Sequence, residues 1–315
     1  MHRAAANHEK NSAALNSVIA AFLLTGMKVV VGVLSGSLGI LAEAAHSGLD
    51  FAAAIVTCIA VRAASKPADR DHAYGHGKVE NLSALAETLL LLATCAWIIR
   101  ESVLRLTSRE VQVDASIWTF AVMAISIVVD FSRSRMLYRV AAKHGSQALE
   151  ADALHFSTDI WSSAVVIFGL FCVKLSEWVP GLSFLLPADS VAAMLVGLIV
   201  VYVSVQLGIR TIQALLDHAP AGMEDKIISV VEALPGVGDC HSVRVRYSGP
   251  QLFVDVHILS DGNQTLRDAH NLTEEIEQAI QSLSPNADVT VHPEPKSEIF
   301  MESSNKTASV QDFAS

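Results

Sequence analysis

Charged residues are scarce in this chain of 315 residues, of which only 17% are Asp, Glu, Lys or Arg. Half of the residues are hydrophobic, and the mean hydropathy of +0.41 is high for a soluble protein. The charge is also uneven, because the part from Ala219 onward has 15 acidic and 6 basic residues and so holds nearly all of the net charge of −10. This acidic balance argues against a nucleic-acid partner. An oily, nearly neutral part followed by a polar, acidic one indicates a membrane domain followed by a soluble domain.

Motifs of several enzyme classes and of disulfide frameworks are missing. The four cysteines fall in no CxxC or paired pattern, and three lie in apolar runs, where a small buried hydrophobe is the usual role. Neither HExxH nor GxSxG occurs, which disfavours an intramembrane metallohydrolase, and we expect no enzyme activity. A signal peptide is not indicated, because the first apolar run is too long and has no clear cleavage site.

Six apolar runs, each near the ~20 residues needed to cross a bilayer, dominate the first part of the chain. They are Ala14–Val33, Leu38–Val61, Leu82–Ile99, Ile117–Val129, Leu149–Val173 and Val191–Leu215. The loops after the second and fourth runs each carry four Lys or Arg residues, so both termini are expected in the cytoplasm. Asp130 interrupts the end of the fourth run. We interpret it as part of an ion pair with Arg133 or Arg135, with proton transfer as the alternative, and expect Glu43 and Glu87 near the membrane interfaces.

After Pro220 the periodicity changes to that of a small α+β domain. Helical patterns cover Glu224–Leu234 and Leu266–Leu283, and alternating, strand-like patterns cover the segments His241–Tyr247, Leu252–Leu259 and Ala287–His292. The predicted order is therefore αββαβ. We expect four regions, which are an N-terminal segment 1–13, a transmembrane domain 14–218, a soluble domain 219–295 and a disordered tail 296–315.

Two stretches inside the second and fifth runs carry the most distinctive pattern. Each contains a His-x-x-x-Asp pair, His46 with Asp50 and His155 with Asp159. An i,i+4 spacing puts both side chains of a pair on one helix face. Two such helices facing each other would offer two imidazoles and two carboxylates, a ligand set that Zn²⁺ takes. Ionisable residues inside a membrane cost roughly 2.5–3.5 kcal/mol each, so two matching pairs favour a functional site over hydrogen bonding within the bundle.

Two further groups of metal-ligand side chains lie outside the apolar runs. The loop after the second run contains Asp69, Asp71, His72 and His76. With Gly75 and Gly77 keeping it mobile, this loop is a candidate divalent-ion site at the cytoplasmic mouth, and an ordinary solvated polar loop is the alternative. The soluble part contains His241, His257, His270, His292 and Glu294. Singly each histidine is a surface or satisfied core residue, but together with the glutamate they predict a metal cluster.

Six motifs follow one another in order relative to the spans: SGSLGILAEAAHSGLD, SKPADRDHAYGHGKVE, EADALHFSTD, LLDHAP, LPGV and VHPEP. On these motifs the chain from about Leu15 to Pro295 resembles the cation diffusion facilitator family of divalent metal/proton antiporters, and within it the zinc/iron-type bacterial members. The resemblance implies six transmembrane helices, a metallochaperone-like cytoplasmic domain and a homodimer in the bacterial inner membrane. It also implies export of Zn²⁺, or of Fe²⁺, Co²⁺ or Cd²⁺, in exchange for protons by alternating access.

The same resemblance implies a role for each candidate group. It maps the transport site onto the two His/Asp pairs, a second site onto the loop residues Asp69, His72 and His76, and a two-metal structural and regulatory site onto the histidines and Glu294 of the soluble domain, reaching across the dimer. His46 stands where zinc/iron members often have Asp, and Glu294 stands where Asp is common. Two histidines with two carboxylates resemble the zinc-selective members, whereas manganese members typically lack the span-five histidine.

Elementary metal chemistry favours the same assignment. Imidazole suits Zn²⁺ and its transition-metal neighbours, while Mg²⁺, Ca²⁺ and Mn²⁺ prefer oxygen ligands. A metal ion must displace protons from histidine, so a His/Asp site binds H⁺ and M²⁺ competitively. A non-transporting metal sensor or scaffold of the same fold is the remaining alternative. The intact intramembrane ligands argue against it, because they are costly to keep without use.

Overall fold

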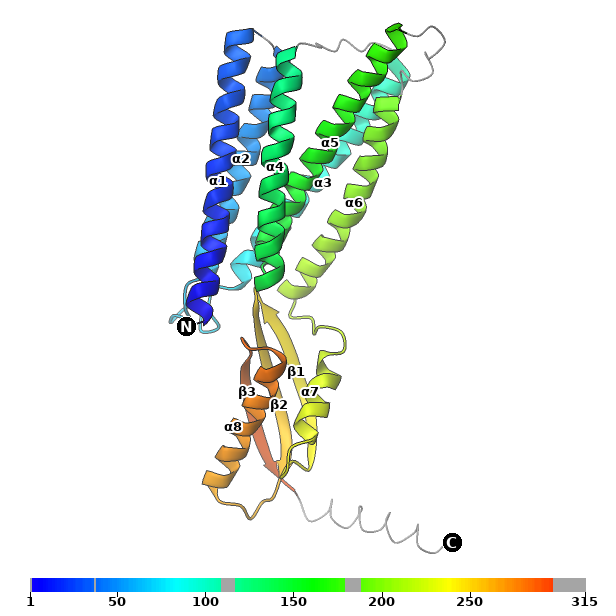
Figure 1. Cartoon of the computed structure of the whole chain (residues 1–315). Helices are drawn as coiled ribbons and strands as arrows, with labels where there is room; N and C mark the ends of the chain where they lie inside the picture. Colours follow the sequence, from blue (N-terminus) through cyan, green and yellow to red (C-terminus); the bar gives the residue numbers. More distant parts are fainter. Residues whose placement is uncertain (1, 37, 109–116, 179–187, 297–315) are drawn as a thin grey trace, which may run out of the picture. The chain divides into compact units, whose positions relative to one another are not determined.

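Six long helices form the first part of the chain. The computed structural model describes residues 2–36, 38–108, 117–178 and 188–296 (Figure 1). The helices are α1 (His2–Ser35), α2 (Leu38–Ala64), α3 (Lys78–Ser108), α4 (Ile117–His144), α5 (Gln147–Trp178) and α6 (Ala188–Leu215). Each contains one of the six predicted apolar runs. The predicted disordered tail lies outside the described residues, except for Lys296.

Four stretches are long and apolar enough to cross a membrane, judged by length and composition within the described residues. They are Ala5–Ser35, Glu43–Ala64, Lys78–Leu104 and Met194–Leu215. The predicted fourth run, in α4, is not among them, and Asp130 and Arg133 interrupt this helix, as expected from the sequence. Helix α5 likewise carries Asp152 and Asp159 within its apolar stretch.

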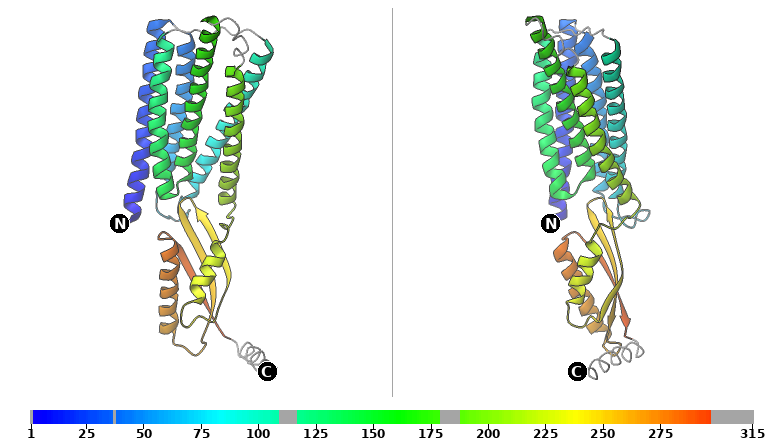
Figure 2. Two further views of the ribbon diagram at one scale, coloured as in Figure 1. Left: turned by 45° about the vertical axis from the view of Figure 1, so that its right-hand side comes forward. Right: turned by 90° about the vertical axis from the view of Figure 1, so that its right-hand side faces the viewer.

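Helix α5 holds the bundle together, because it contacts α2, α3, α4 and α6 (Figures 1 and 2). The turn that leads into it is tight. Gly145 has a φ of +63°, and the N–H of Ser146 donates to the carbonyl of Ala141 at 3.1 Å. A left-handed glycine followed by such a bond is a Schellman ending, which stops α4 and lets α5 begin at once. This connection makes α4 and α5 antiparallel neighbours.

Helix α1 begins at His2, well before the predicted apolar run. Lys10 in this polar part of the helix is buried, because its charge has a partner. The Lys10 ammonium lies 2.6 Å from Oε1 of Glu80 on α3, and both side chains are buried. The hydroxyl of Ser146 donates to the other oxygen of Glu80. The ion pair extends the helix beyond the apolar residues that sequence periodicity detects.

The rest of the chain forms a second compact unit, since contacts divide the protein into Met1–Leu215 and Leu216–Ser315. Its elements are α7 (Met223–Glu232), β1 (Asp239–Ser248), β2 (Gln251–Ser260), α8 (Leu266–Leu283) and β3 (Asp288–Pro295). This is the predicted αββαβ order, and α8 has the predicted bounds. Strands β1 and β2 are antiparallel, β2 and β3 are parallel, and the sheet order is β1-β2-β3.

Helices α7 and α8 cover one face of this sheet and contact each other (Figure 2). The core between the layers contains Ile227 of α7, Val256 and Ile258 of β2, and Ile276 of α8, all fully buried. Helix α8 is fixed at its start by Thr265, whose hydroxyl accepts from the N–H of Asp268 at 3.2 Å, the usual N-cap arrangement. The opposite face of the sheet carries no helix within the described residues.

Truncation of this core tests the layer arrangement. We expect Ile276→Ala to lower the free energy of unfolding of a 216–296 fragment by about 2–5 kcal/mol, because the fully buried side chain leaves a cavity. Leu266→Ala on the same helix is the control, since Leu266 is 88% exposed and its loss changes stability by less than about 0.5 kcal/mol. Urea unfolding followed by circular dichroism measures both. Equal effects of the two variants would contradict the described core.

Candidate metal centres

The two His/Asp pairs lie on facing helices. His46 and Asp50 are on α2, and His155 and Asp159 are on α5, which packs against α2. The Nε2 atom of His46 is 3.9 Å from an oxygen of Asp50 and 3.8 Å from one of Asp159. The Nε2 atom of His155 is 3.1 Å from Asp50 and 3.7 Å from Asp159. Each imidazole therefore faces both carboxylates; His46, Asp50 and Asp159 form a group with ligand atoms close enough for one ion, and His155 borders it.

The four side chains differ in how far they are exposed to solvent. The side chain of His155 is 3% exposed, those of Asp50 and Asp159 are 12% and 17% exposed, and that of His46 is 38% exposed. A cavity of about 70 Å³ adjoins the group and is lined by His46, Asp50 and Asp159 among others. This volume exceeds what a single water needs, so the cavity can hold a small ion beside these side chains. His46 is thus the most accessible of the four, and His155 the least.

Cations and acids outside the two pairs also line this cavity. The lining includes Lys28, Glu43, Asp130 and Arg133. The ammonium of Lys28 donates to the hydroxyl of Ser47 at 2.7 Å and lies 3.3 Å from Glu43. Arg133 lies 3.2 Å from Asp130, which is the ion pair expected for this acid. Lys28 and Arg133 thus each have an acidic neighbour outside the two His/Asp pairs.

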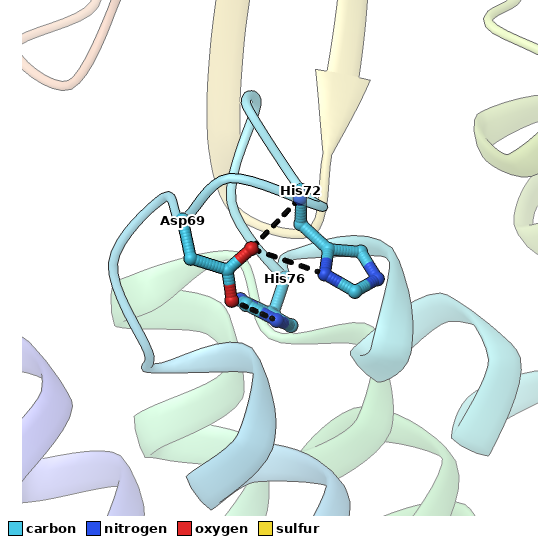
Figure 3. Close-up of side chains that lie close together, drawn as sticks. All are labelled: Asp69, His72 and His76. Atoms are coloured by element: carbon cyan, nitrogen blue, oxygen red, sulfur yellow. Dashed lines mark hydrogen bonds and ion pairs between the residues drawn. The ribbon is translucent and has the colours of Figure 1, made fainter.

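The loop after α2 gathers a second group, Asp69, His72 and His76 (Figure 3). One carboxylate oxygen of Asp69 lies 3.3 Å from Nδ1 of His72, and the other lies 3.4 Å from Nε2 of His76. The two imidazole rings are 4.3 Å apart, measured between centroids. Gly75, with a φ of +77°, makes the turn that returns the chain toward Asp69. Two imidazole nitrogens thus approach the carboxylate, and the three residues offer three ligand atoms.

Backbone bonds hold this carboxylate in place. Asp69 accepts from the N–H of His72 at 2.7 Å and from that of Asp71 at 3.0 Å. The backbone hydrogen bond from His72 is the main cause that lowers the pKa of Asp69, and the imidazole of His72 adds to it. A lowered pKa keeps the carboxylate ionised and therefore able to bind a cation. Asp71 itself is not part of the three-residue group.

In the second unit, the sheet register brings three histidines into a row. His241 of β1 pairs with His257 of β2, and His257 pairs with His292 of β3. The ring centroids are 5.7 Å apart in the first pair and 4.7 Å in the second. Side chains opposite each other on neighbouring strands lie on the same face of a sheet. Because Val256 and Ile258 fill the helix-covered face, this row lies on the other face.

Glu294 completes this row. It lies two residues after His292, so it is on the same face, and one oxygen is 2.8 Å from Nδ1 of His257. Its other oxygen is 3.5 Å from Nε2 of His241. The hydrogen bond with His257 is the main cause that lowers the pKa of Glu294, and the three histidines add to it. His241, His257 and Glu294 form a group with ligand atoms close enough for one ion, and His292 borders it.

His270 lies apart from this group in the single chain. It is on α8, where its Nε2 atom is 3.5 Å from Glu274 one helix turn later. The family resemblance assigns His270 to a site that reaches across a dimer, so its role as a ligand stays a prediction.

Two acidic residues outside the candidate groups are buried inside the bundle. Glu87, expected near a membrane interface on sequence grounds, is only 5% exposed and accepts a hydrogen bond from Thr57 of α2, so it faces the interior of the bundle. Asp152, one of its neighbours, is 1% exposed and was not singled out at all. The only sequence signal for these buried acids is an acidic residue within an apolar run. This signal does not show which face of the helix is buried.

Comparison with known proteins places both units in one family. The family model described as the cation efflux transmembrane domain matches residues 14–216, and that described as the cation efflux protein, cytoplasmic domain, matches residues 219–296. The cation-efflux pump FieF of Serratia proteamaculans is 33% identical over 288 residues, covering 90% of this chain and 92% of the relative. FieF of Pectobacterium atrosepticum is 32% identical over 292 residues, covering 91% and 93%.

Among solved structures, one titled MamM-CTD 215-293 matches 24% of this chain and 95% of its own, with 25% identity and a TM-score of 0.23. The two family models together account for nearly all of the described chain. The predicted architecture, a helical membrane domain followed by a small cytoplasmic α+β domain, is confirmed by these matches. The chain is a multi-pass membrane protein and belongs to the cation efflux family.

Proposed function

We propose that this protein exports divalent metal cations, Zn²⁺ foremost, from the cytoplasm in exchange for protons. One observation carries the proposal, namely that two imidazoles and two carboxylates face one another at 3.1–3.9 Å inside the membrane unit. The names of the relatives, cation-efflux pumps, support efflux as the direction of transport. The transport ligands are His46, Asp50, His155 and Asp159.

The ligand chemistry favours Zn²⁺ as substrate. Two nitrogens and two oxygens match the tetrahedral sets of zinc proteins, in which Zn–N and Zn–O distances are about 2.0–2.2 Å. Only small side-chain movements are needed to bring Nε2 and carboxylate oxygens, now 3.1–3.9 Å apart, around one ion. Fe²⁺, Co²⁺ and Cd²⁺ accept similar donors and are secondary candidates.

Proton exchange follows from the same ligands. An imidazole binds a metal only when neutral, so the ion and protons compete for His46 and His155. In a conformation open to the cytoplasm the metal displaces protons, and in one open to the other side protons displace the metal. Such alternation around one site couples the two flows in opposite directions. We place the protein in a bacterial inner membrane with both termini in the cytoplasm, on the distribution of Lys and Arg between loops.

The two other groups serve this transport. Asp69, His72 and His76 are exposed to half-buried loop ligands and are suited to capture an ion before it enters the bundle. The histidine row with Glu294 is a structural and regulatory ion site in the cytoplasmic domain. Because this row is on the helix-free face of the sheet, it is open to ligands from a second copy, including His270, and we propose that the protein works as a homodimer.

Removal of one transport carboxylate tests the main proposal. We expect Asp159→Asn to reduce zinc uptake driven by a proton gradient to the level of empty liposomes, because the site loses a charge that offsets the metal ion. The measurement uses the full chain in proteoliposomes that contain a zinc-sensitive dye. Asp71→Asn is the control, since this loop carboxylate lies outside the three groups and its loss should leave uptake near the parent rate. Undiminished uptake by Asp159→Asn would refute the transport site.

Selectivity is tested at His46. We expect His46→Asp to raise the ratio of Cd²⁺ to Zn²⁺ transport, because a shorter side chain at the most exposed ligand position leaves room for the larger ion. The same proteoliposomes, loaded with a dye that reports both metals, give the two rates. A ratio equal to that of the parent would mean that His46 does not set the choice of metal.

The cytoplasmic site is tested by its response to zinc and acid. We expect zinc to raise the fraction of full-length chain cross-linked as a dimer at about pH 7.5, and acidification to about pH 5.5 to abolish this effect as imidazole ligands take up protons. Glu294, whose pKa is lowered, stays ionised across this range and does not cause the change. His257→Ala should remove the zinc effect, and His218→Ala, an exposed histidine outside the row, should retain it. A dimer fraction that ignores zinc would exclude the regulatory role.

A further inference from the structure

Two acidic side chains that the transport site does not use lie together inside the membrane unit. Glu87 of α3 and Asp152 of α5 are 5% and 1% exposed. They lie on α3 and α5 near a cluster of buried apolar residues that includes Ala84, Leu91, Ala151 and Leu154. The two acids come from helices that pack against each other, and each carboxyl group acts electrostatically on the other. Two acids thus share a dry environment in which a single charge is already costly.

Each carboxyl group has one satisfied oxygen and one that lacks a donor. Thr57 of α2 donates to Oε2 of Glu87 at 2.8 Å, and Ser17 of α1 donates to Oδ2 of Asp152 at 3.2 Å. Within the described residues, Oε1 of Glu87 and Oδ1 of Asp152 are buried and have no hydrogen-bond partner. A buried acceptor without a donor costs about 1–3 kcal/mol, and more when it is charged. The two carboxyl groups therefore lack a hydrogen-bond donor for these two oxygens.

A single proton supplies that donor. Two neighbouring carboxylates cannot both be ionised at neutral pH without strong repulsion, as in the paired acids of aspartic proteases. With one proton, one carboxyl O–H donates to the facing carboxylate and both orphaned oxygens are satisfied. The pair then carries one negative charge instead of two, and the proton belongs to the pair rather than to either residue.

The cations nearby do not replace this proton. Arg133 of α4 is 3.2 Å from Asp130 and donates to the hydroxyl of Ser17 at 3.1 Å, so that it reaches Asp152 through the serine. Its guanidinium also lies 3.5 Å from the ring centre of Phe156. The other ionisable group that acts on the pair is His155, one turn after Asp152 on α5. Arg133 and His155 are thus near the pair without forming an ion pair with it in the described contacts.

We propose that Glu87 and Asp152 form a proton-binding site that holds one shared proton and releases it when a divalent cation occupies the His/Asp site. The second half rests on the proposed function. A doubly charged ion bound by His155 and its partners lies about one helix turn from the pair and favours the form with both acids ionised. The released proton goes to solvent, and the metal charge offsets the carboxylate charge that it leaves behind. The pair thereby adds a proton to the exchange beyond those displaced from the histidines.

Infrared spectroscopy of the metal-free full-length protein tests the shared proton directly. We expect the parent at neutral pH to show the C=O stretch of a protonated carboxyl group, shifted on deuterium exchange, and we expect both Glu87→Gln and Asp152→Asn to lose it. Glu80→Gln is the matched control, because Glu80 is also a buried glutamate of α3 but faces the Lys10 ammonium at 2.6 Å. This variant should keep the band. Absence of the band from the parent, or its persistence in both single variants, would overturn the proposal.

Proton release on zinc binding tests the coupling. With a pH indicator in weakly buffered detergent solution, we expect Glu87→Gln to release fewer protons per bound zinc than the parent, by about one at most, while it still binds zinc. Glu80→Gln should match the parent. Equal release by Glu87→Gln and the parent would refute the coupling. Because the infrared measurement needs no zinc, failure of Asp159→Asn to stop transport would refute the proposed function and leave the shared proton standing.

Discussion

The structure depends on how charge is accommodated between helices that have little water around them. An unpaired ion in such a place is unstable, so each buried ionisable side chain must face a partner of opposite charge, a hydrogen-bond donor or a bound ion. Helices α2 and α5 meet this requirement by facing two His/Asp pairs toward each other, with each imidazole 3.1–3.9 Å from both carboxylates. The protons on the imidazoles and a divalent ion are alternative ways to balance the same two negative charges. That exchangeability is the physical basis of the proposed transport.

The remaining buried charges show two different solutions. Lys10 and Glu80 form an ion pair at 2.6 Å that fixes the start of α1 against α3, and Arg133 and Asp130 form one within α4. Such pairs are neutral as a whole and have no need of an exchangeable ion. Glu87 and Asp152 are instead two acids that act on each other, so balancing their negative charge requires an exchangeable proton or ion. The contrast separates side chains that hold the bundle together from those suited to carry a proton.

The sequence predicted the order of elements and the placing of each histidine and its aspartate on one helix face, because both rest on local periodicity. The i,i+4 spacing fixes His46 with Asp50 on one helix face whatever the rest of the chain does. It could not predict the place of Glu87, since α3 is apolar on most sides and the buried face depends on how α5 packs against it. The helical start of α1 was also beyond local patterns, because Lys10 needs Glu80, 70 residues away, to be buried.

The histidine row shows why strand alternation alone does not predict on which face of the sheet His241 lies. On β1, Val245 and Val243 point toward the helices, so strict alternation from them would put His241 on the same covered face. The register instead shifts between His241 and Arg244, where Ser242 has a φ of +49°. One extra residue in a strand reverses which face the following side chains occupy. Cys240 therefore enters the core, and His241 turns outward to lie opposite His257. The alignment of the histidine row thus depends on a single bulge, and a left-handed residue other than glycine is kept there at some cost in backbone strain.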